Sequence, residues 1–164
     1  SGNIGATNVN RLIGKKFGVI TLFLDFLKTF CPCLIMHKYF GTEVGVISGF
    51  LTILGHIYPI WLKFKGGKGV ASYMGFMLAT SWPLFIVLII TWLVIVKIFK
   101  YSAVAAIISI LINLITFKII LFTQFNYNIL LWIKGDPIEF QFILFISIII
   151  LIKHYTNVIN IFKK

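Results

Sequence analysis

The sequence predicts an all-α, polytopic membrane protein with about six membrane-crossing helices. Hydrophobic residues make up 60% of the chain and charged residues only 12%, whereas a soluble domain is about 45–50% apolar and about 25% charged. A chain of 164 residues has too small an interior to bury this much hydrocarbon, so lipid must cover the excess. Several apolar runs also approach the roughly 20 residues that a helix needs to cross a bilayer while satisfying its own backbone groups.

The first part of the chain contains two predicted spans. Residues 1–16 are polar and contain three glycines, and we expect a loop there rather than a span. Apolar runs follow at residues 17–36 and 44–62, and a compact, basic, glycine-rich loop follows at residues 63–69. We expect both apolar runs to be membrane-crossing helices.

The next apolar run, residues 71–99, is longer than one helix needs and contains Pro83. Proline removes a backbone donor and disfavours helix at the residue before it. We therefore predict two helices that meet at residues 80–83. Parity supports this split, because the loop at 65–69 and the tail at 153–157 can share one membrane face only if an even number of crossings separates them.

Two further apolar runs, at residues 101–122 and 142–152, complete the six predicted crossings. The Gly135–Asp136–Pro137 turn lies between them, and from residue 153 the sequence becomes a polar, basic tail. We expect all of these elements to belong to one membrane domain, residues 1–164.

The formal net charge is +11, from 15 basic and 4 acidic residues. The basic residues lie mostly between the apolar runs, and such loops tend to stay cytoplasmic and to meet anionic headgroups or phosphorylated solutes. No groove-reading element is visible, so we expect no nucleic-acid partner. The three histidines and four acids lack the spacing of metal ligands, and we expect neither a metal nor a cofactor.

The most specific string is Lys65-Gly66-Gly67-Lys68-Gly69, directly before a predicted helix. Glycines let backbone N–H groups turn toward an anion, the helix N-terminus adds a positive dipole end, and the two lysines add point charges. The string therefore predicts a phosphate cradle at the membrane surface. A flexible basic turn with no ligand is the alternative. A nucleotide P-loop is excluded because glycine, not serine or threonine, follows the second lysine.

A second string opens the chain, where Ser1, Asn3, Thr7 and Asn8 alternate with glycines and Arg11 follows. Small hydroxyl and amide groups offer directional hydrogen bonds, and the arginine fork suits a phosphate. The alternative is that these residues only form a turn and cap a helix.

Other polar residues lie within or beside the apolar runs, where burial in lipid makes them costly and marks them as functional candidates. Asp25 and Lys28 are three residues apart and can pair along one helix. His56 lies at the end of its helix nearest Lys65, and Ser102 falls at the membrane face of the basic loops. For each of these residues a structural role is the alternative.

A third constellation is formed by Lys153, His154 and Asn157. On a helix these positions lie close to one face. A purely structural His–Asn pair near a membrane end is the alternative.

Together the strings resemble the bacterial membrane family of acyl-phosphate:glycerol-3-phosphate acyltransferases. The family's SGNxGATNxxR loop matches residues 1–11, its GHxxP pattern matches residues 55–59, and its FKGGKGVAT loop matches residues 64–72 with Ser72 in place of threonine. The family usually has one more helix before the first motif, and we expect this chain to lack it. The remaining matches are Asp25 and Lys28 of a DxxKG pattern, Tyr101 and Ser102 of a YSS element, and Lys153, His154 and Asn157 of a basic-His-x-x-Asn tail.

The resemblance implies a seven-helix bundle that transfers a fatty acyl group from acyl phosphate to the 1-hydroxyl of glycerol 3-phosphate. The products would be lysophosphatidic acid, a phospholipid precursor, and phosphate. It also implies a monomeric, multi-pass protein of the bacterial cytoplasmic (inner) membrane, in contact with membrane lipid, whose active site faces the cytoplasm.

Acyl phosphate is already activated, so no covalent nucleophile is required, and the sequence contains neither a Gly-x-Ser-x-Gly elbow nor a His-x4-Asp motif. We expect direct attack by the hydroxyl group, with the departing phosphate or His154 accepting the proton. The catalytic candidates are His154, Asn157, Lys68 and Ser102. The substrate- and phosphate-binding candidates are Ser1, Asn3, Thr7, Asn8, Arg11, Lys65, Gly66, Gly67, Gly69 and His56.

Two other functions fit the membrane character of the chain. A transporter of a phosphorylated solute predicts charges lining a path and repeated halves, and no internal repeat is visible. A purely structural membrane subunit leaves the cluster of motifs unexplained.

Overall fold

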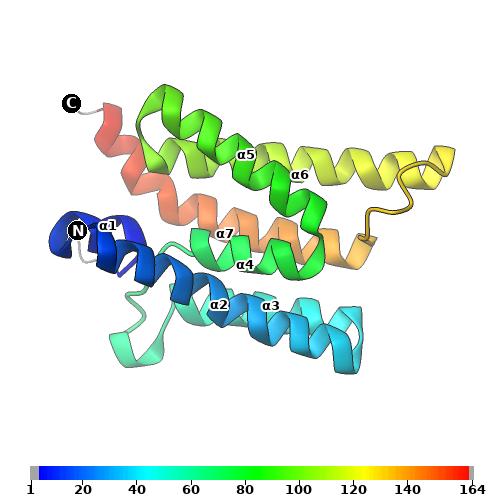
Figure 1. Ribbon diagram of the computed structural model, residues 1–164, viewed down its shortest axis with the longest axis horizontal. Coiled ribbons are helices and arrows are strands. Elements are labelled where there is room, and N and C mark those ends of the chain that lie inside the picture. The colour runs from blue at the N-terminus through cyan, green and yellow to red at the C-terminus, as the bar shows by residue number, and fades with distance from the viewer. Residues whose placement is uncertain (1–3, 163–164) are drawn as a thin grey trace. The chain divides into compact units, whose positions relative to one another are not determined.

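The computed structural model describes residues 4–162, apart from the side chains of residues 156, 158 and 160–162. Within this range the chain forms seven α-helices and one short 3-10 helix, with no strand, which confirms the predicted all-α fold (Figure 1). The elements are, in order, α1 (Ala6–Ile13), α2 (Lys15–Phe40), α3 (Thr42–Ile57), η1 (Ile60–Leu62), α4 (Val70–Thr80), α5 (Trp82–Phe99), α6 (Ser102–Tyr127) and α7 (Pro137–Phe162).

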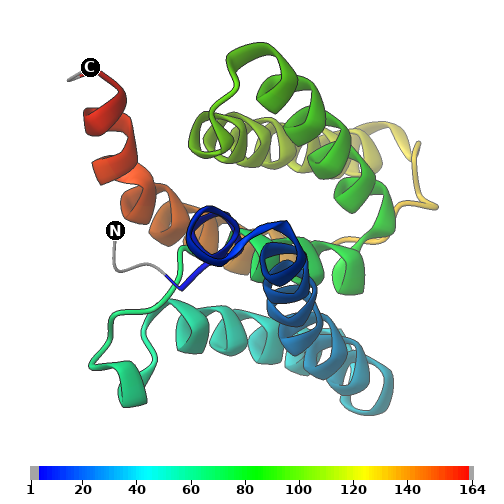
Figure 2. The same ribbon diagram turned by 60° about the vertical axis from the view of Figure 1, so that its left-hand side comes forward.

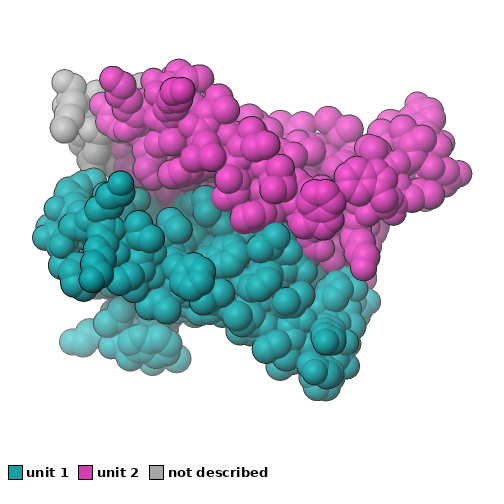
Figure 3. All heavy atoms as spheres, viewed as in Figure 1, with its two compact units in different colours: residues 1–79 teal, residues 80–164 magenta. Residues whose placement is uncertain are grey.

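The chain divides into two compact units, residues 1–79 and residues 80–164 (Figure 3). The first contains α1, α2, α3 and all but the last residue of α4, and the second contains α5, α6 and α7. The expectation of one domain over residues 1–164 stays a prediction.

Among the described helices, five segments are long and apolar enough to cross a membrane. Large apolar side chains such as Phe23, Leu93 and Ile115 are exposed along them, as lipid-facing positions require. The sixth predicted crossing corresponds to α4, which has 11 residues and is therefore roughly 16 Å long, about half the thickness of the hydrocarbon core. The five segments are Lys15–Phe40, Thr42–Leu62, Trp82–Phe99, Ser102–Tyr127 and Pro137–Tyr155.

The predicted break near Pro83 is confirmed. Helix α4 ends at Thr80, Ser81 adopts an extended conformation, and α5 begins at Trp82 with Pro83 in its first turn. Proline is tolerated there because the first N–H groups of a helix have no intrahelical acceptor.

The expected loop over residues 1–16 is wrong for residues 6–13, which form α1. Gly5 and Gly14 flank this helix, and Gly14 has a φ of 108° that favours glycine. Helix α1 packs on α2 closely enough that a Cβ added at Gly18 would lie 2.6 Å from the Cβ of Asn10. Packing against α2 therefore stabilises a helix that polar composition does not reveal.

Helix α7 begins before the predicted apolar run of residues 142–152 and continues past it, from Pro137 to Phe162, so Lys153, His154 and Asn157 lie on a helix as expected. No glycine or proline follows Pro137 to end the helix, and polar side chains alone do not end one. A capping box fixes its start: the Glu139 N–H donates to Asp136 Oδ1 at 2.7 Å, and the Asp136 N–H donates to Glu139 Oε2 at 3.0 Å.

In the first unit, α2 and α3 form an antiparallel hairpin that turns at Gly41, and α4 packs against both (Figure 1). The hypothetical Cβ of Gly75 would lie 2.3 Å from the Phe26 carbonyl oxygen on α2, and that of Gly49 on α3 would lie 2.5 Å from the Phe76 ring on α4. Glycine at these positions therefore allows the three helices to approach closely. After α3 the chain turns through η1 and returns to the start of α4 (Figure 2).

In the second unit, α6 packs against both α5 and α7. Asn113 on α6 is fully buried, and its Nδ2 donates a 2.7 Å hydrogen bond to the carbonyl oxygen of Leu84 on α5. Because α6 and α7 form an antiparallel hairpin, Ser102 at the start of α6 and His154 near the end of α7 lie toward the same end of this pair (Figure 1).

Candidate active site

The basic, glycine-rich loop folds back onto the end of α3. The Gly67 N–H donates a 3.1 Å hydrogen bond to the His56 carbonyl oxygen. A Cβ at Gly66 would lie 2.1 Å from that same oxygen and 2.5 Å from Cδ of Pro59. Residue 66 must therefore be glycine for the loop to pass this close to the helix end.

Gly67 lies directly against the imidazole of His56. A Cβ added at Gly67 would lie 2.0 Å from Nε2 and 2.5 Å from Cε1 of this ring. Gly67 is buried, and the His56 side chain is only 3% exposed. The expectation that His56 lies beside the loop is confirmed.

The loop enters α4 through Gly69, whose φ of 84° favours glycine. The Gly69 carbonyl oxygen accepts the Tyr73 N–H at 2.7 Å, which makes the first turn of α4. The first N–H groups of α4 have no intrahelical acceptor, and they lie next to Lys68 in the chain. The predicted junction of glycine loop, lysine and helix start is therefore present.

Lys68 is half-buried, and its Nζ is buried without a hydrogen-bond partner among the described residues. Burial lowers the pKa of this ammonium below its ordinary value. Lys65, in contrast, is exposed. A buried cation without a partner is costly, so the surroundings of Lys68 favour an anionic ligand.

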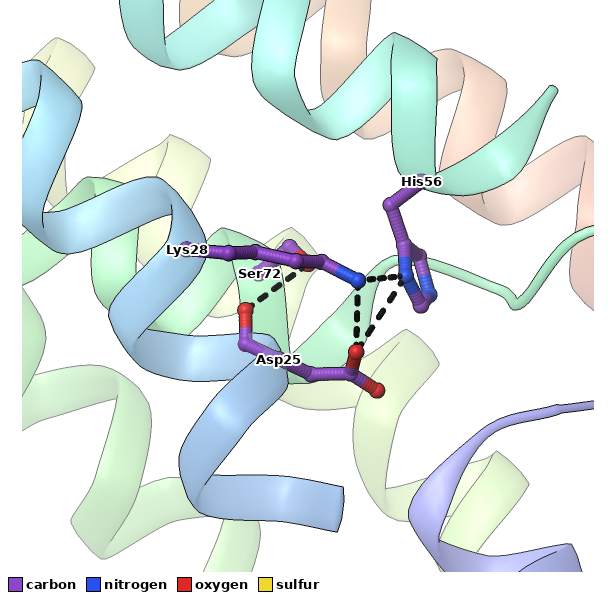
Figure 4. Close-up of polar contacts among 4 residues, drawn as sticks. All are labelled: Asp25, Lys28, His56 and Ser72. Atoms are coloured by element: carbon purple, nitrogen blue, oxygen red, sulfur yellow. Dashed lines mark hydrogen bonds and ion pairs between the residues drawn. The ribbon is translucent and has the colours of Figure 1, made fainter. Parts of the chain in front are cut away.

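Asp25, Lys28 and His56 meet between α2 and α3 (Figure 4). Lys28 Nζ lies 2.5 Å from Asp25 Oδ1, which confirms the predicted pair, and it also bonds His56 Nδ1. Asp25 Oδ1 lies 3.4 Å from the same nitrogen. The cluster therefore joins the Asp25–Lys28 pair of the DxxKG pattern to His56 of the GHxxP pattern.

Ser72 connects the same cluster to α4. Its Oγ is fully buried and donates a 3.0 Å hydrogen bond to the Asp25 carbonyl oxygen (Figure 4). The start of α4, which follows the glycine loop, is thereby attached to α2.

A cavity of about 360 Å³ opens beside this cluster in the first unit. Lys28 and His56 provide its charged and titratable groups, while Ile4 brings the N-terminal string to its wall. A lining that contains both polar and apolar residues suits an amphiphilic ligand. The lining residues are Ile4, Lys28, Thr52, Gly55, His56, Pro59 and Trp61.

The predicted residues of the N-terminal string are only partly visible. Ser1 and Asn3 lie outside the described residues. Thr7 and Arg11 are exposed on α1 and Asn8 is half-buried there. Among the described residues, no hydrogen bond or ion pair joins Thr7 or Arg11 to the glycine loop.

The remaining predicted residues belong to the second unit. Ser102 is half-buried at the first position of α6. His154 is 3% exposed, and its Nδ1 bonds the Ile150 carbonyl oxygen at 2.8 Å. A carbonyl oxygen can only accept, so Nδ1 carries the proton and Nε2 is the basic nitrogen of the neutral ring. Asn157 is half-buried three residues further along α7. That Ser102, His154 and Asn157 share one pocket with Lys68 stays a prediction.

Comparison with known proteins decides the family. The family model described as glycerol-3-phosphate acyltransferase matches residues 1–164. The chain belongs to the glycerol-3-phosphate acyltransferase family. It is therefore an acyltransferase rather than a transporter or a structural subunit, and the predicted family is confirmed.

Relatives in this family match nearly the whole chain. The glycerol-3-phosphate acyltransferases of Bartonella henselae and Aquifex aeolicus are each 38% identical to it, over 96% of this chain and 71% and 77% of their own lengths. Two crystal structures of PlsY (YgiH), an integral membrane glycerol 3-phosphate acyltransferase, are 34% identical and cover 99% of this chain. The lysophosphatidic acid form has a TM-score of 0.85 over 77% of that chain, and the glycerol 3-phosphate form has 0.86 over 76%. The chain is thus an integral membrane acyltransferase.

The sequence did not show that His56 joins Asp25 and Lys28, but the spacing around Gly41 contains a signal for it. Lys28 and Asp25 lie 13 and 16 residues before Gly41, and His56 lies 15 residues after it. In an antiparallel helical hairpin, residues at equal distances from the turn lie at the same level. Counting from the turn would therefore have placed these three residues side by side.

Proposed function

We propose that this acyltransferase transfers a fatty acyl group from acyl phosphate to the 1-hydroxyl of glycerol 3-phosphate. The hydroxyl oxygen forms a bond to the acyl carbonyl carbon, the bond from that carbon to the phosphate oxygen breaks, and lysophosphatidic acid and phosphate leave. The buried Lys68 ammonium, which has no partner among the described residues, is the observation that carries the proposal. The crystal structures of PlsY in glycerol 3-phosphate and lysophosphatidic acid forms also support it.

The first unit provides the proposed phosphate site. Lys68 supplies a buried positive charge, and Lys65 at the exposed end of the loop attracts the incoming anion. The backbone N–H groups of residues 66, 68 and 69 and the imidazole of His56 supply further donors, whereas the Gly67 N–H is already bonded to the His56 carbonyl oxygen. Donors that are already in place when the phosphate departs stabilise the charge that develops on it.

The N-terminal string completes the site from the side of α1. We assign substrate binding to Ser1, Asn3, Thr7, Asn8 and Arg11. Ile4, between Asn3 and Gly5, lines the cavity that contains His56, which supports this assignment. Both substrates carry a phosphate, so the site has a second phosphate to bind. Arg11 is the residue of this group best suited to it, because the arginine fork matches phosphate oxygens.

The second unit provides Ser102, His154 and Asn157. Ser102, at the start of α6, is proposed to hydrogen-bond a phosphate, and Asn157 to orient a substrate hydroxyl group. The reaction requires an acceptor for the hydroxyl proton, and two are available in the proposal: the departing phosphate and Nε2 of His154. The hydrogen bond from Nδ1 to Ile150 holds the ring in the tautomer that leaves Nε2 basic.

A His154→Gln variant separates these two proton acceptors. If His154 is the base, kcat falls by about 100-fold or more, because the hydroxyl proton loses its acceptor. If the departing phosphate takes the proton, kcat changes little. Single-turnover measurements across pH 6–9 distinguish the two results.

The site is proposed to lie where hydrocarbon meets water on the cytoplasmic side of the bacterial inner membrane, in a monomer surrounded by lipid. One substrate is a lipid and the other a soluble dianion, so both reach the reacting atoms only at such a boundary. The basic loops are consistent with this orientation, because such loops tend to stay cytoplasmic.

A donor competition assay tests the reaction. Purified protein is given radiolabelled glycerol 3-phosphate with palmitoyl phosphate, palmitoyl-CoA or palmitoyl-acyl carrier protein, and the lipid product is identified. The proposal predicts lysophosphatidic acid from palmitoyl phosphate alone. Efficient transfer from either thioester, with none from the acyl phosphate, contradicts it.

A further inference from the structure

We propose that the Asp25–Lys28 pair sets the tautomer of His56, so that the Nε2–H of this ring donates to a phosphate group held by the glycine loop. Asp25 and Lys28 then act as positioning residues, through His56. The ligand in this inference rests on the proposed function, whereas the tautomer follows from the contacts within the first unit.

The pair lies on a membrane-spanning helix, where ionised side chains are costly and tend to have a function. Lys28 Nζ and Asp25 Oδ1 are 2.5 Å apart, and the Asp25 side chain is 13% exposed. Replacing such a pair by apolar residues often leaves a protein as stable or more stable. Fold stability alone therefore does not explain why the charges are here.

The bond between Lys28 and His56 determines where the imidazole proton lies. An ammonium has three donors and no acceptor, so Nδ1 of His56 must accept from Lys28 Nζ with its lone pair. The proton of the neutral ring is then on Nε2. Asp25 Oδ1, at 3.4 Å from Nδ1, takes its hydrogen bond from Lys28 and holds that ammonium in place.

The Nε2 atom is the part of the ring that faces the glycine loop. A Cβ at Gly67 would lie 2.0 Å from it, so only glycine fits against this edge of the ring. Within the described part of the chain no group accepts a hydrogen bond from Nε2. The next residue, Lys68, has a buried Nζ that also lacks a partner there. Two donors without acceptors thus belong to one loop and the ring beneath it, and a phosphate oxygen is the acceptor that suits both.

The second buried histidine provides an internal comparison. In His154 the Nδ1 atom donates to a carbonyl oxygen, so Nε2 of that ring has no proton. The two rings therefore have opposite tautomers: His56 presents a donor through Nε2, and His154 presents a base. The same chemical group thus presents a donor in one unit and a hydrogen-bond acceptor in the other.

The test measures the tautomers directly in the full chain, in lipid nanodiscs, with 15N-labelled histidine. The chain has three histidines, so the spectrum is simple, and a His56→Asn variant assigns the signal. We expect His56 to show a proton on Nε2 and His154 a proton on Nδ1. In Lys28→Met the His56 signal changes to the other tautomer or to a mixture, whereas Lys28→Arg keeps it on Nε2. Lys38→Met, on the same helix but away from the cluster, is the matched control and leaves it unchanged.

The ligand is tested with inorganic phosphate, and then with glycerol 3-phosphate and palmitoyl phosphate separately. Phosphate is expected to shift the His56 Nε2–H resonance in the wild type and in Lys38→Met, but not in Lys28→Met. The kcat/KM of Lys28→Met is expected to fall about tenfold to hundredfold, as for the loss of one hydrogen bond to a charged group, with partial rescue in Lys28→Arg. The substrate whose KM rises is the one whose phosphate His56 binds.

The outcomes separate this inference from the proposed function. A wild-type His56 with its proton on Nδ1 overturns the inference whatever the activity. The predicted tautomer with no response to any of the three phosphates, and full activity in Lys28→Met, overturns the positioning role and leaves the proposed reaction standing. A phosphate response without acyl transfer from palmitoyl phosphate supports the inference and contradicts the proposed function.

Discussion

The imidazole of His56 lies so close to Gly67 that a residue with a Cβ at position 67 would overlap the ring. A Cβ at this position would lie 2.0 Å from the imidazole Nε2, and the Gly67 N–H donates to the carbonyl oxygen of the same histidine. The loop that carries Lys68 therefore takes its shape from the end of α3. The conformation of the proposed phosphate site thus depends on packing inside the first unit.

Replacing Gly67 by alanine is expected to damage both fold and activity. The added methyl group must displace the buried ring or the loop, and such overpacking costs about 1–3 kcal/mol. Acyl transfer is expected to fall at least about 100-fold, because donors moved from their places no longer stabilise the departing phosphate. Thermal unfolding in detergent and an acyl-transfer assay measure the two effects.

The matched control for stability is Gly55→Ala on α3. No atom lies within 4 Å of a Cβ at this position, and alanine within a helix is more stable than glycine by about 0.5–1 kcal/mol. The unfolding temperature of this variant is expected to be equal or higher. If Gly67→Ala is as stable and as active as the wild type, the contact described here is wrong.

The hydrogen bond from Ser72 to Asp25 gives a second prediction. Ser72 is fully buried and connects α4 to α2 through a 3.0 Å bond to a carbonyl oxygen. Ser72→Ala is expected to lower the free energy of unfolding by about 1 kcal/mol, as for the loss of one buried hydrogen bond. Ser48→Ala, at a half-buried position of α3, should have a smaller effect. Equal effects of both variants would show that the bond does not hold the helices together.

Binding of glycerol 3-phosphate is expected to depend on pH through Lys68. Burial lowers the pKa of this residue, so its ammonium is lost at a lower pH than that of an ordinary lysine. Above about pH 7 the phosphate is a dianion, because its second pKa is near 6. Affinity is therefore expected to be highest below the lowered pKa and to decline as the pH rises through it. Binding near this pKa should take up a proton, which calorimetry in two buffers of different ionisation enthalpy detects.

Lys68→Arg is the control for this pH dependence, because an arginine stays charged over the same range. Its affinity should not decline with rising pH, and no proton should be taken up. The lowered pKa also affects folding: between the pKa values of the folded and unfolded chain the unfolded state binds more protons, so stability without ligand rises with pH there. Proton uptake that is unchanged in Lys68→Arg would assign the effect to another group.

The capping box of α7 gives a prediction for the second unit. Asp136 and Glu139 satisfy each other's backbone N–H groups at the start of the helix that carries His154. Asp136→Ala is expected to destabilise the protein by about 0.5–2 kcal/mol, as other lost N-caps do. Glu43→Ala, in the first turn of α3, provides the comparison because no cap hydrogen bond is formed there. Matching unfolding temperatures for the two variants would contradict the importance of the box.

Sequence reasoning predicted the features that depend on composition and local chemistry. The long apolar runs predicted the spanning helices, Pro83 predicted the break between α4 and α5, and the spacing of Asp25 and Lys28 predicted their pair. The family motifs predicted the acyltransferase identity. These features follow from short stretches of chain whose physical consequences do not depend on distant partners.

The features that sequence reasoning missed depend on tertiary packing. Helix α1 forms in a polar segment because it packs on α2 near Gly18. The bond from Lys28 to His56 joins two helices that are separate in sequence. Lys28 and His56 meet because they lie at the same level along the two helices of the α2–α3 hairpin. A list of motifs does not show which residues lie at the same level.

The role of Lys68 as the buried cation that binds a substrate phosphate is tested most directly by comparing Lys68→Ala with Lys63→Ala, an exposed lysine of the same loop. The measurement is kcat/KM for acyl transfer from palmitoyl phosphate to glycerol 3-phosphate, in protein shown to be folded. We expect Lys68→Ala to lose about 100-fold to 1,000-fold, as enzymes do when one stabilising donor is removed, and Lys63→Ala to stay close to the wild type. Equal turnover by Lys68→Ala and the wild type would contradict the account.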